Sequence, residues 1–468
     1  MELYRDNPRA TSWLRQQATR FDDPLRLAVI GPSAAGKSTL VNALVGDGVA
    51  PIEPSGTQVM CFYRGAQEPR AIGYPAAAPP RELPAGRSAR RLRIDLDGLA
   101  GEGIGRLEVG WPSRSLRELV LIDTPAVGPD SEPRAVRSVC ADADAVLCLL
   151  RQPYGTDLDV LRAVHEHPAM RAPVNALVVL SRADELGAGR VDGLISARQI
   201  ARRRRREADV HEVCQDVVAV AGLAASGGRT LGEPEFTALA MLARLPKEEL
   251  DTQLLSAQRF GRGDSPLPVD AATREGLLGR FGLFGIRLAT TLIRRGADSQ
   301  PALAAQLVQR SGLGELRESI DQYFVAPAEV LKARSALVAV DVLLRMEPRP
   351  GTAALSAELD RALAGAHELQ ELRLLATLQA ERDLLPEDWR EDAERLIGAY
   401  GTGLPERLGL HQPSGAEIYQ AVHDALWRWR AQVENPALGV AARRAAMTVL
   451  RSCEAMAVGG GDPRPAYF

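Results

Sequence analysis

The sequence of 468 residues is poor in lysine and in aromatic side chains, and its few cysteines form no motif. Only three of its 57 basic residues are lysine, namely Lys37, Lys247 and Lys332. The five cysteines are scattered without CxxC or metal-ligand spacing, which argues against a zinc or disulfide scaffold and is typical of a reduced, cytosolic protein. A net charge of −3 supplies no strongly basic surface, so we expect no nucleic-acid partner.

Long apolar runs and targeting segments are lacking as well. No stretch reaches the roughly 18 apolar residues that a membrane-spanning helix needs. The best candidate, "GLFGIRLATTLI", is short and contains Arg287. The start, "MELYRDNPRATSW", has no basic segment followed by an apolar one, unlike a signal peptide. We therefore expect a cytoplasmic protein that meets a membrane only peripherally.

The first two thirds of the chain alternate between apolar runs and helix-like stretches. Continuously apolar runs predict strands buried on both faces, and their alternation with helices predicts a mostly parallel, doubly wound α/β sheet. These runs lie at 26–31, 116–123, 145–151, 175–181 and 216–222. Between 62 and 112, further strands are expected at a sheet edge, interrupted by a Pro/Ala/Gly-rich loop at 75–88.

After Phe324 the composition changes to Leu, Ala, Glu and Arg at helical spacing, which predicts an α-helical bundle. An amphipathic stretch at 8–21 predicts an N-terminal helix. The predicted organisation is an N-terminal helix at 1–23, an α/β domain at 24–325, a helical bundle at 326–458 and a disordered tail at 459–468.

The segment from Gly31 to Ser38, "GPSAAGKS", fits the phosphate-loop pattern G-x-x-x-x-G-K-[ST] directly after a predicted strand. Glycines let phosphate oxygens approach the backbone N–H groups, and a lysine places a compact charge between the β- and γ-phosphates. A fortuitous glycine-rich turn is the alternative. The predicted phosphate-binding residues are Gly31, Ser33, Ala34, Ala35, Gly36, Lys37, Ser38 and Thr39.

Three oxygen-bearing side chains are candidates to hold Mg²⁺. The Ser38 hydroxyl belongs to the phosphate loop, and Asp123 ends the apolar strand in "LVLIDTP". Thr57, in the loop "EPSGTQV", is the candidate second hydroxyl. Either of the last two can instead be an ordinary polar residue that ends a strand or lies in a loop.

The third motif is a candidate for recognising the purine base of a bound nucleotide. Ser181-Arg182-Ala183-Asp184 follows a predicted strand and matches the [NTS]-[KR]-x-D form of a guanine-recognition loop. A carboxylate at Asp184 accepts from the ring N–H and the amino group of guanine, a donor pair that adenine lacks. Arg182 is expected to stack on the base, and Gly222 and Leu223 to flank it. The three motifs in order favour GTP or GDP over ATP.

With these motifs, the sequence resembles the dynamin-like GTPases of bacteria, and most of all their actinobacterial branch of isoniazid-inducible mycobacterial proteins and Streptomyces sporulation-division dynamins. The resemblance covers nearly the whole chain and includes the segments "TQVMCFYRG", "RFGRGDSPLPVD" and "SGLGELRESIDQYF". It implies a P-loop GTPase domain, with the N-terminal helix folded onto the C-terminal helices as a neck. It also implies GTP-dependent dimerisation through the nucleotide faces.

The resemblance implies a catalytic set of Lys37, Ser38, Thr57 and Ser33. Three positions depart from the family pattern. Ser33 stands where many members have a catalytic glutamine, Ala34 where they have a serine, and Ala126 where a glycine follows Asp-Thr-Pro. All three departures predict slow hydrolysis.

The resemblance further implies self-assembly, a second dynamin-like partner, division proteins and peripheral or indirect membrane contact. Two alternatives stay open: a GTP-controlled scaffold with negligible hydrolysis that binds a membrane-anchored partner, and a ribosome-associated GTPase, which would need a basic appendage.

Two further features are less specific. The five arginines at 202–206 predict a solvated helix surface, with anionic lipid or an acidic partner as the alternative. Trp427 and Trp429 are expected to pack within the helical bundle, with insertion into a membrane interface as the alternative.

Overall fold

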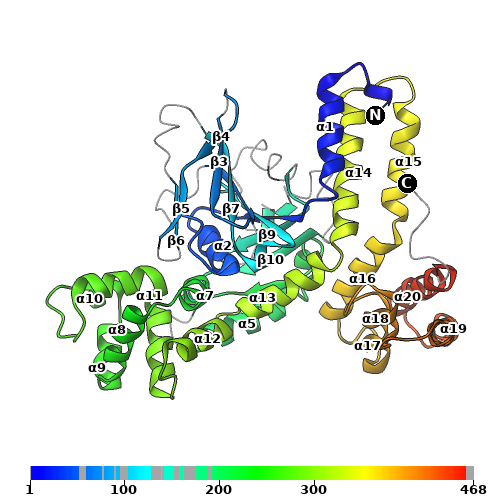
Figure 1. Cartoon of the computed structure of the whole chain (residues 1–468). Helices are drawn as coiled ribbons and strands as arrows, with labels where there is room; N and C mark the ends of the chain where they lie inside the picture. Colours follow the sequence, from blue (N-terminus) through cyan, green and yellow to red (C-terminus); the bar gives the residue numbers. More distant parts are fainter. Residues whose placement is uncertain are drawn as a thin grey trace.

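The computed structural model describes residues 2–51, 59–75, 78–88, 91–94, 104–127, 139, 142–151, 158–159, 161–162, 175–186 and 192–459 (Figure 1). The strands are β1 (Leu25–Ile30), β2 (Met60–Gly65), β3 (Arg70–Pro75), β4 (Arg81–Leu83), β5 (Ala85–Ser88), β6 (Arg91–Ile94), β7 (Ile104–Trp111), β8 (Leu119–Asp123), β9 (Ala145–Leu150), β10 (Ala176–Leu180) and β11 (Val217–Ala219).

The helices of the first two thirds are α1 (Pro8–Thr19), α2 (Lys37–Val45), α5 (Gly193–Arg204), α6 (Ala208–His211), α7 (Gly222–Arg229), α8 (Glu233–Ala243), α9 (Lys247–Gln253), α10 (Ala257–Gly261), α11 (Ala271–Arg294), α12 (Gln300–Arg310) and α13 (Leu313–Ile320). Those that follow are α14 (Ala328–Met346), α15 (Thr352–Gly365), α16 (His367–Ala380), α17 (Glu387–Leu396), α18 (Leu404–Leu408), α19 (Gly415–Val433) and α20 (Val440–Gly459). Short turns of helix lie at η1 (Glu2–Tyr4), η3 (Arg114–Leu116), η7 (Ala183–Glu185) and η8 (Asp321–Val325).

The central sheet has nine strands in the order β11-β10-β9-β1-β8-β2-β7-β3-β4. Strands β11, β10, β9, β1 and β8 are mutually parallel, and β2 joins this block in antiparallel orientation. The mostly parallel α/β sheet that the apolar runs predicted is thereby confirmed. Because parallel strands all end at one edge, the loops that follow β1, β8, β10 and β11 meet there.

Alternation along β1 shows why both faces of the sheet must be covered. Leu25, Leu27 and Val29 belong to one hydrophobic cluster, whereas Ala28 and Ile30 belong to another on the opposite face. Successive side chains of a strand point to opposite faces, so a strand apolar at every position needs a layer of helices on each side.

The edge of the sheet differs from the sequence prediction in two ways. The predicted loop at 75–88 contains β4 and β5. Strand β6 pairs with β5 in a separate two-stranded sheet instead of joining the edge of the main one. The segment of β5, "AGRS", has no apolar alternation, so its extended form depends on pairing with β6 and has no local signature.

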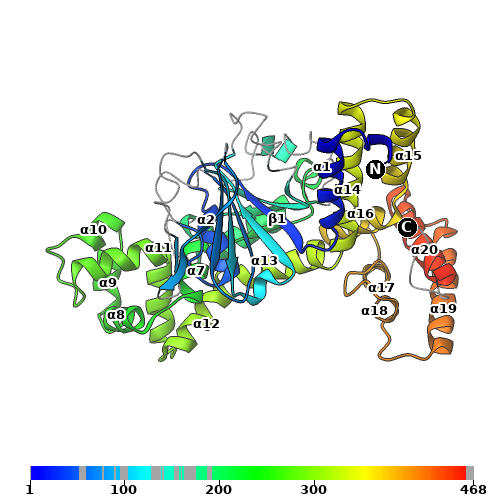
Figure 2. The ribbon, with the colours of Figure 1, turned by 45° about the horizontal axis from the view of Figure 1, so that its top comes forward.

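Helix α1 packs against α14, far along the chain (Figures 1 and 2). Tyr4, Ala10, Leu343 and Leu344 form a cluster of buried side chains between these elements. Lys332 adds a polar tie, because its ammonium donates to the carbonyl oxygens of Phe21 and Asp23 at 2.5 and 3.1 Å. The bundle of N- and C-terminal helices that the resemblance implied is confirmed, whereas the exact domain boundaries stay predictions. Of the tail predicted at 459–468, Gly459 ends α20, and residues 460–468 lie outside the described residues.

The helices beyond the sheet gather at two opposite ends of the molecule. Helices α8–α10 lie at one end, and α17–α20 at the other (Figures 1 and 2). Within the described residues, α11 alone is long and apolar enough to cross a membrane by length and composition, which is weak support for a span. Phe281, Phe284 and Leu288 of α11 lie in the core cluster on one face of the sheet. Gly282, with φ 63°, also breaks its helical backbone. Helix α11 is therefore a core helix.

The two tryptophans of α19 have opposite surroundings, so the prediction that both pack in the bundle is wrong for one of them. Trp429 is fully buried, and its indole N–H donates to Asp392 Oδ2 at 2.9 Å. Trp427 is 69% exposed. Residues two apart on a helix point about 200° apart, so a single apolar face cannot take both.

Gly312, between α12 and α13, lies where the backbone conformation and the close packing both require a glycine. Its φ is 84°, and a Cβ there would lie 2.1 Å from the carbonyl oxygen of Ala219, at the end of β11. Gly312→Ala is expected to lower the free energy of unfolding by about 2–4 kcal/mol, from backbone strain and overpacking. Thermal or denaturant unfolding measures it.

Gly314, two residues on, is the matched control. It is helical, and a Cβ there would meet nothing within 4 Å. Gly314→Ala is expected to leave stability unchanged or slightly raised. Equal effects of the two substitutions would contradict the account of Gly312.

Candidate functional site

The loop between β1 and α2 has the backbone of a tight strand-to-helix turn. Gly31 has φ 145°, and a Cβ there would lie 2.5 Å from the carbonyl oxygen of Leu149. Gly36, with φ 94°, precedes the first residue of α2. Ala34 adopts φ 56°, which is uncommon for a residue with a side chain. The turn therefore directs backbone N–H groups and the N-terminus of α2 toward one point, an arrangement suited to an anion.

Lys37 is buried at the start of α2, and its ammonium lies within its own loop. It donates to the carbonyl oxygens of Gly31 and Pro32 at 3.1 Å each. Burial lowers the pKa of this ammonium, and the neighbouring Asp123 carboxylate opposes the shift. The charge is held where a phosphate group could replace the two carbonyls as its partner.

Ser38, near the start of α2, and Asp123, at the end of β8, come together. Asp123 ends β8, which pairs with β1 in parallel, and it faces Val29 in the register. The Ser38 hydroxyl donates to Asp123 Oδ2 at 2.7 Å. In the described part of the chain, no group of three or more His, Cys, Asp or Glu side chains could hold a metal ion. A hydroxyl and a carboxylate suit Mg²⁺ only if phosphate oxygens and water complete the shell.

The segment after β8 is tied to the same loop. The backbone N–H of Val127 donates to the Gly31 carbonyl at 3.0 Å, and the Thr124 hydroxyl donates to the Val29 carbonyl at 2.9 Å. Ala126, in between, is exposed. The predicted Mg²⁺ ligand Thr57 lies outside the described residues. A change at the phosphate loop would therefore reach the segment after Asp123 through backbone hydrogen bonds.

The predicted base-recognition loop follows β10. Arg182 adopts φ 53°, and its guanidinium Nε lies 2.8 Å from Glu185 Oε1, partly in solvent. Burial, as the largest cause, raises the pKa of the Asp184 carboxyl, and the neighbouring Glu185 adds to the shift. An ionised Asp184 here would gain from a ligand that donates hydrogen bonds.

A third loop completes the arrangement. Strand β11 leads through Val220 into α7, which begins at Gly222. The N–H of Ala183 donates to the Val220 carbonyl at 3.4 Å, so this loop contacts the one that carries Asp184. A Cβ on Gly222 would lie 3.6 Å from Thr39 of α2, an ordinary contact distance.

All three loops line one pocket of about 280 Å³, close to the lower end of the roughly 300–1,000 Å³ of small-molecule sites. Of the predicted residues it brings together Ala34, Ala35, Gly36, Lys37, Ser38, Thr39, Ser181, Arg182, Asp184, Gly222 and Leu223. Gly31 and Asp123 support the loop from behind, and Ser33 is exposed outside the lining.

The pocket also has walls that the motifs did not indicate, namely Leu40, Leu149, Val179, Glu185 and Val220. Three of them are apolar residues at or just past the carboxyl ends of β9, β10 and β11. These residues could have been predicted from their position at the end of each predicted strand, because the strand ends lie together at one edge of a parallel sheet.

The chain has close sequence relatives. Isoniazid-induced protein IniC of Mycobacterium tuberculosis, from strains CDC 1551 and H37Rv, is 38% identical over 465 residues, which are 97% of this chain and 94% of the relative. No protein-family model matches the chain.

Two solved structures of an oligomerised bacterial dynamin pair, described as a mechanism for long-range sensing and tethering of membranes, align with 12% identity. They cover 97% and 96% of this chain and 87% of their own chains, with TM-scores of 0.32 and 0.33. Such scores mean that the backbones superpose poorly over the full length, so the family assignment depends on the sequence relatives. The chain belongs to the family of the mycobacterial isoniazid-induced protein IniC, in the actinobacterial branch of dynamin-like proteins that its motifs resemble.

Proposed function

We propose that this protein binds GTP with Mg²⁺ and uses it to control its own assembly at the cytoplasmic face of a membrane. The observation that carries the proposal is the single pocket in which Lys37 and Asp184 line the same space. A buried ammonium at a helix N-terminus suits a triphosphate, and a carboxylate on the next wall suits guanine. Gly222 and Leu223 would flank the base.

Calorimetric titration of the purified chain with GTP, GDP and ATP tests this directly. We expect GTP and GDP to bind with Mg²⁺ present, and ATP to bind at least about 100-fold more weakly, because adenine leaves the Asp184 carboxylate unpaired. Equal affinity for ATP and GTP would show that Asp184 does not select guanine. If no nucleotide binds, the proposal is wrong.

Ser38 and Asp123 would hold Mg²⁺, directly or through water, and Thr57 would be the second hydroxyl. The paired oxygens of Ser38 and Asp123, 2.7 Å apart, fit such a role. When bound, the ion neutralises charge on the phosphate oxygens. Binding of Mg²⁺ requires the Ser38 hydroxyl to turn its hydrogen away from Asp123, so that its oxygen is available.

We infer slow hydrolysis. Ser33 is exposed and outside the pocket lining, and its short hydroxyl is poorly suited to orient a water. Ala34 lacks the serine hydroxyl that the resemblance associates with turnover, and Ala126 adds a methyl group where the family has a glycine. The competing function is a GTP-controlled scaffold with negligible hydrolysis. Turnover per molecule that rises with protein concentration would favour the hydrolase, and turnover at background throughout would favour the scaffold.

Assembly and membrane contact are proposed from the resemblance to dynamin-like proteins. We propose self-association through the nucleotide faces, a second dynamin-like protein or division proteins as partners, and peripheral membrane contact during division, sporulation septation or envelope stress. The relative's induction by isoniazid, as its name states, agrees with the last of these. Liposome co-sedimentation with and without GTP is the test. If no lipid binds under either condition, membrane contact is indirect.

The raised pKa of Asp184 predicts a pH dependence with opposite signs in two assays. Guanine needs the carboxylate, so GDP affinity is expected to fall as the pH drops through the raised pKa, by up to about tenfold per pH unit. Without nucleotide, the protonated form is favoured by folding, so the contribution of Asp184 to stability is lost as the pH rises through the same value.

Calorimetry and thermal unfolding over this pH range measure the two trends. Asp184→Asn should remove the contribution of Asp184 from the pH dependence of both GDP affinity and stability. Any pH dependence of affinity that comes from the nucleotide phosphates should stay. A wild-type affinity curve parallel to that of the variant would contradict the assignment.

A further inference from the structure

A second pocket, of about 530 Å³, lies away from the nucleotide loops, between α5, α13 and the end of α16. It is lined by five arginines and three carboxylates, so its lining carries a net charge of +2. Three of the five arginines, Arg202, Arg205 and Arg206, belong to the run at 202–206 that was expected to be a solvated helix surface. Arg202, Arg203 and Arg206 are exposed, as that expectation requires, whereas Arg204 is buried and Arg205 is half-buried.

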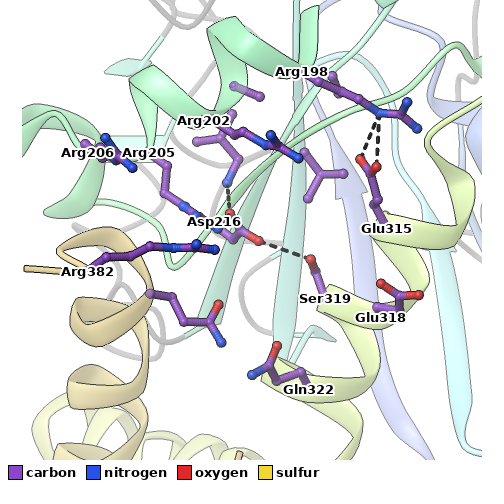
Figure 3. A pocket seen from close by; sticks show the side chains of 15 residues that line it. Arg198, Arg202, Arg205, Arg206, Asp216, Glu315, Glu318, Ser319, Gln322 and Arg382 are labelled. Atoms are coloured by element: carbon purple, nitrogen blue, oxygen red, sulfur yellow. Dashed lines mark hydrogen bonds and ion pairs between the residues drawn. The ribbon is translucent and has the colours of Figure 1, made fainter. Parts of the chain in front are cut away.

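Two of the three carboxylates in the pocket are already paired. Arg198 Nε lies 3.0 Å from Glu315 Oε1, and Arg205 Nη1 lies 3.2 Å from Asp216 Oδ1 (Figure 3). The Ser319 hydroxyl also donates to Asp216, at 3.1 Å. These contacts hold the walls together and remove most of the negative charge that a ligand would meet.

Three guanidinium groups stay available. The side chains of Arg202, Arg206 and Arg382 make no ion pair or hydrogen bond with any residue in the described ranges, and Glu318 is the remaining carboxylate. Arg202 extends from α5 and Arg382 from the segment after α16, on opposite walls of the pocket (Figure 3). Charges of one sign held on facing walls repel each other, so an anion between them would stabilise the arrangement.

The neighbouring arginines of the run differ. Arg204 is buried and pairs with Glu207. The Arg203 side chain is 85% exposed and does not line the pocket. The run is therefore divided by helix geometry into pocket-lining, buried and solvent-facing members.

We propose that this pocket binds a phosphate-bearing anion through Arg202, Arg206 and Arg382. Guanidinium groups bind phosphate oxygens in a bidentate manner, and the Gln322 amide adds a neutral donor at the floor. Because Arg382 belongs to the C-terminal helices and Arg202 to the α/β part, the bound anion links the two parts. The phosphate can belong to a soluble polyanion or to a lipid headgroup. The inference does not depend on nucleotide binding.

The test uses the full chain with Lys37→Ala, so that the nucleotide loop does not take up the probe. Tripolyphosphate is titrated calorimetrically, and vesicles of phosphatidylcholine with or without phosphatidic acid are tested by co-sedimentation. The variants are Arg202→Gln, Arg382→Gln and the double substitution. Arg203→Gln is the matched control, since it removes the same charge from the same helix. Thermal unfolding confirms that each variant is folded.

We expect each pocket substitution to weaken binding of the probe by about fivefold to tenfold, the double substitution to abolish it, and Arg203→Gln to leave it nearly unchanged. Binding of tripolyphosphate identifies a soluble anion, and binding of phosphatidic acid vesicles alone identifies a lipid headgroup. Equal weakening by Arg203→Gln would show general electrostatic attraction, and binding unaffected by the double substitution, or no binding of either probe, would likewise overturn the proposal.

Discussion

Lys37→Ala is expected to weaken the binding of GTP and GDP by about 100-fold or more, since a charge-assisted contact to phosphate is lost from a buried site. Lys37 is buried, and within the described ranges its ammonium donates to the loop carbonyls of Gly31 and Pro32. Its removal therefore leaves the phosphates facing backbone N–H groups without a cation. Calorimetry or fluorescent-nucleotide displacement measures the loss.

Lys247→Ala is the control, because Lys247 is an exposed lysine on α9. It is expected to bind nucleotide like the wild type. Lys37→Arg is the more demanding variant: it keeps the charge, but a planar guanidinium is too bulky for the turn, so affinity should stay low. Wild-type affinity in Lys37→Arg would mean that charge alone matters at this position. Wild-type affinity in Lys37→Ala would show that Lys37 does not bind the phosphates.

Asp184→Asn is expected to change which base is bound. The amide no longer accepts two hydrogen bonds from guanine, so affinity for GTP should fall by about 100- to 1,000-fold. Xanthine carries a carbonyl where guanine has its amino group, and the amide N–H can donate to it. Affinity for xanthosine triphosphate should therefore rise while that for GTP falls.

Glu185→Gln is the matched control, because Glu185 lines the same pocket and pairs with Arg182. Its base preference should stay that of the wild type. If Asp184→Asn weakens both nucleotides equally, Asp184 supports the loop and does not recognise the base. If Glu185→Gln changes the preference instead, the reader of the base is the neighbouring carboxylate.

The phosphate loop and the parallel strands were predictable because their signals are local. Gly31 and Gly36 are needed for a backbone with positive φ, and a strand such as β9, buried at every position, must be continuously apolar. The order of strand, loop and helix then places the ends of the strands at one edge. The candidate site therefore follows from segments of about ten residues each, read in order.

Other features depend on which distant segments meet. Strand β5 has no signature until β6 pairs with it. Trp429 is buried and Trp427 is exposed because α20 and residues of α17 pack on one side of α19. Val220 lines the same pocket as Lys37 and Asp184 because β11 lies beside β10. Such contacts are decided by packing between elements, which local periodicity does not encode.

By itself, then, the sequence determined the α/β sheet, the phosphate loop and the aspartate that would read a base, because each needs particular residues in one short segment. Only the tertiary structure decided that these loops share a pocket that excludes Ser33, and that Arg202 faces Arg382 across a second one. The physical reason is that a side chain's surroundings depend on the element packed opposite it, and that element can lie 180 residues away along the chain.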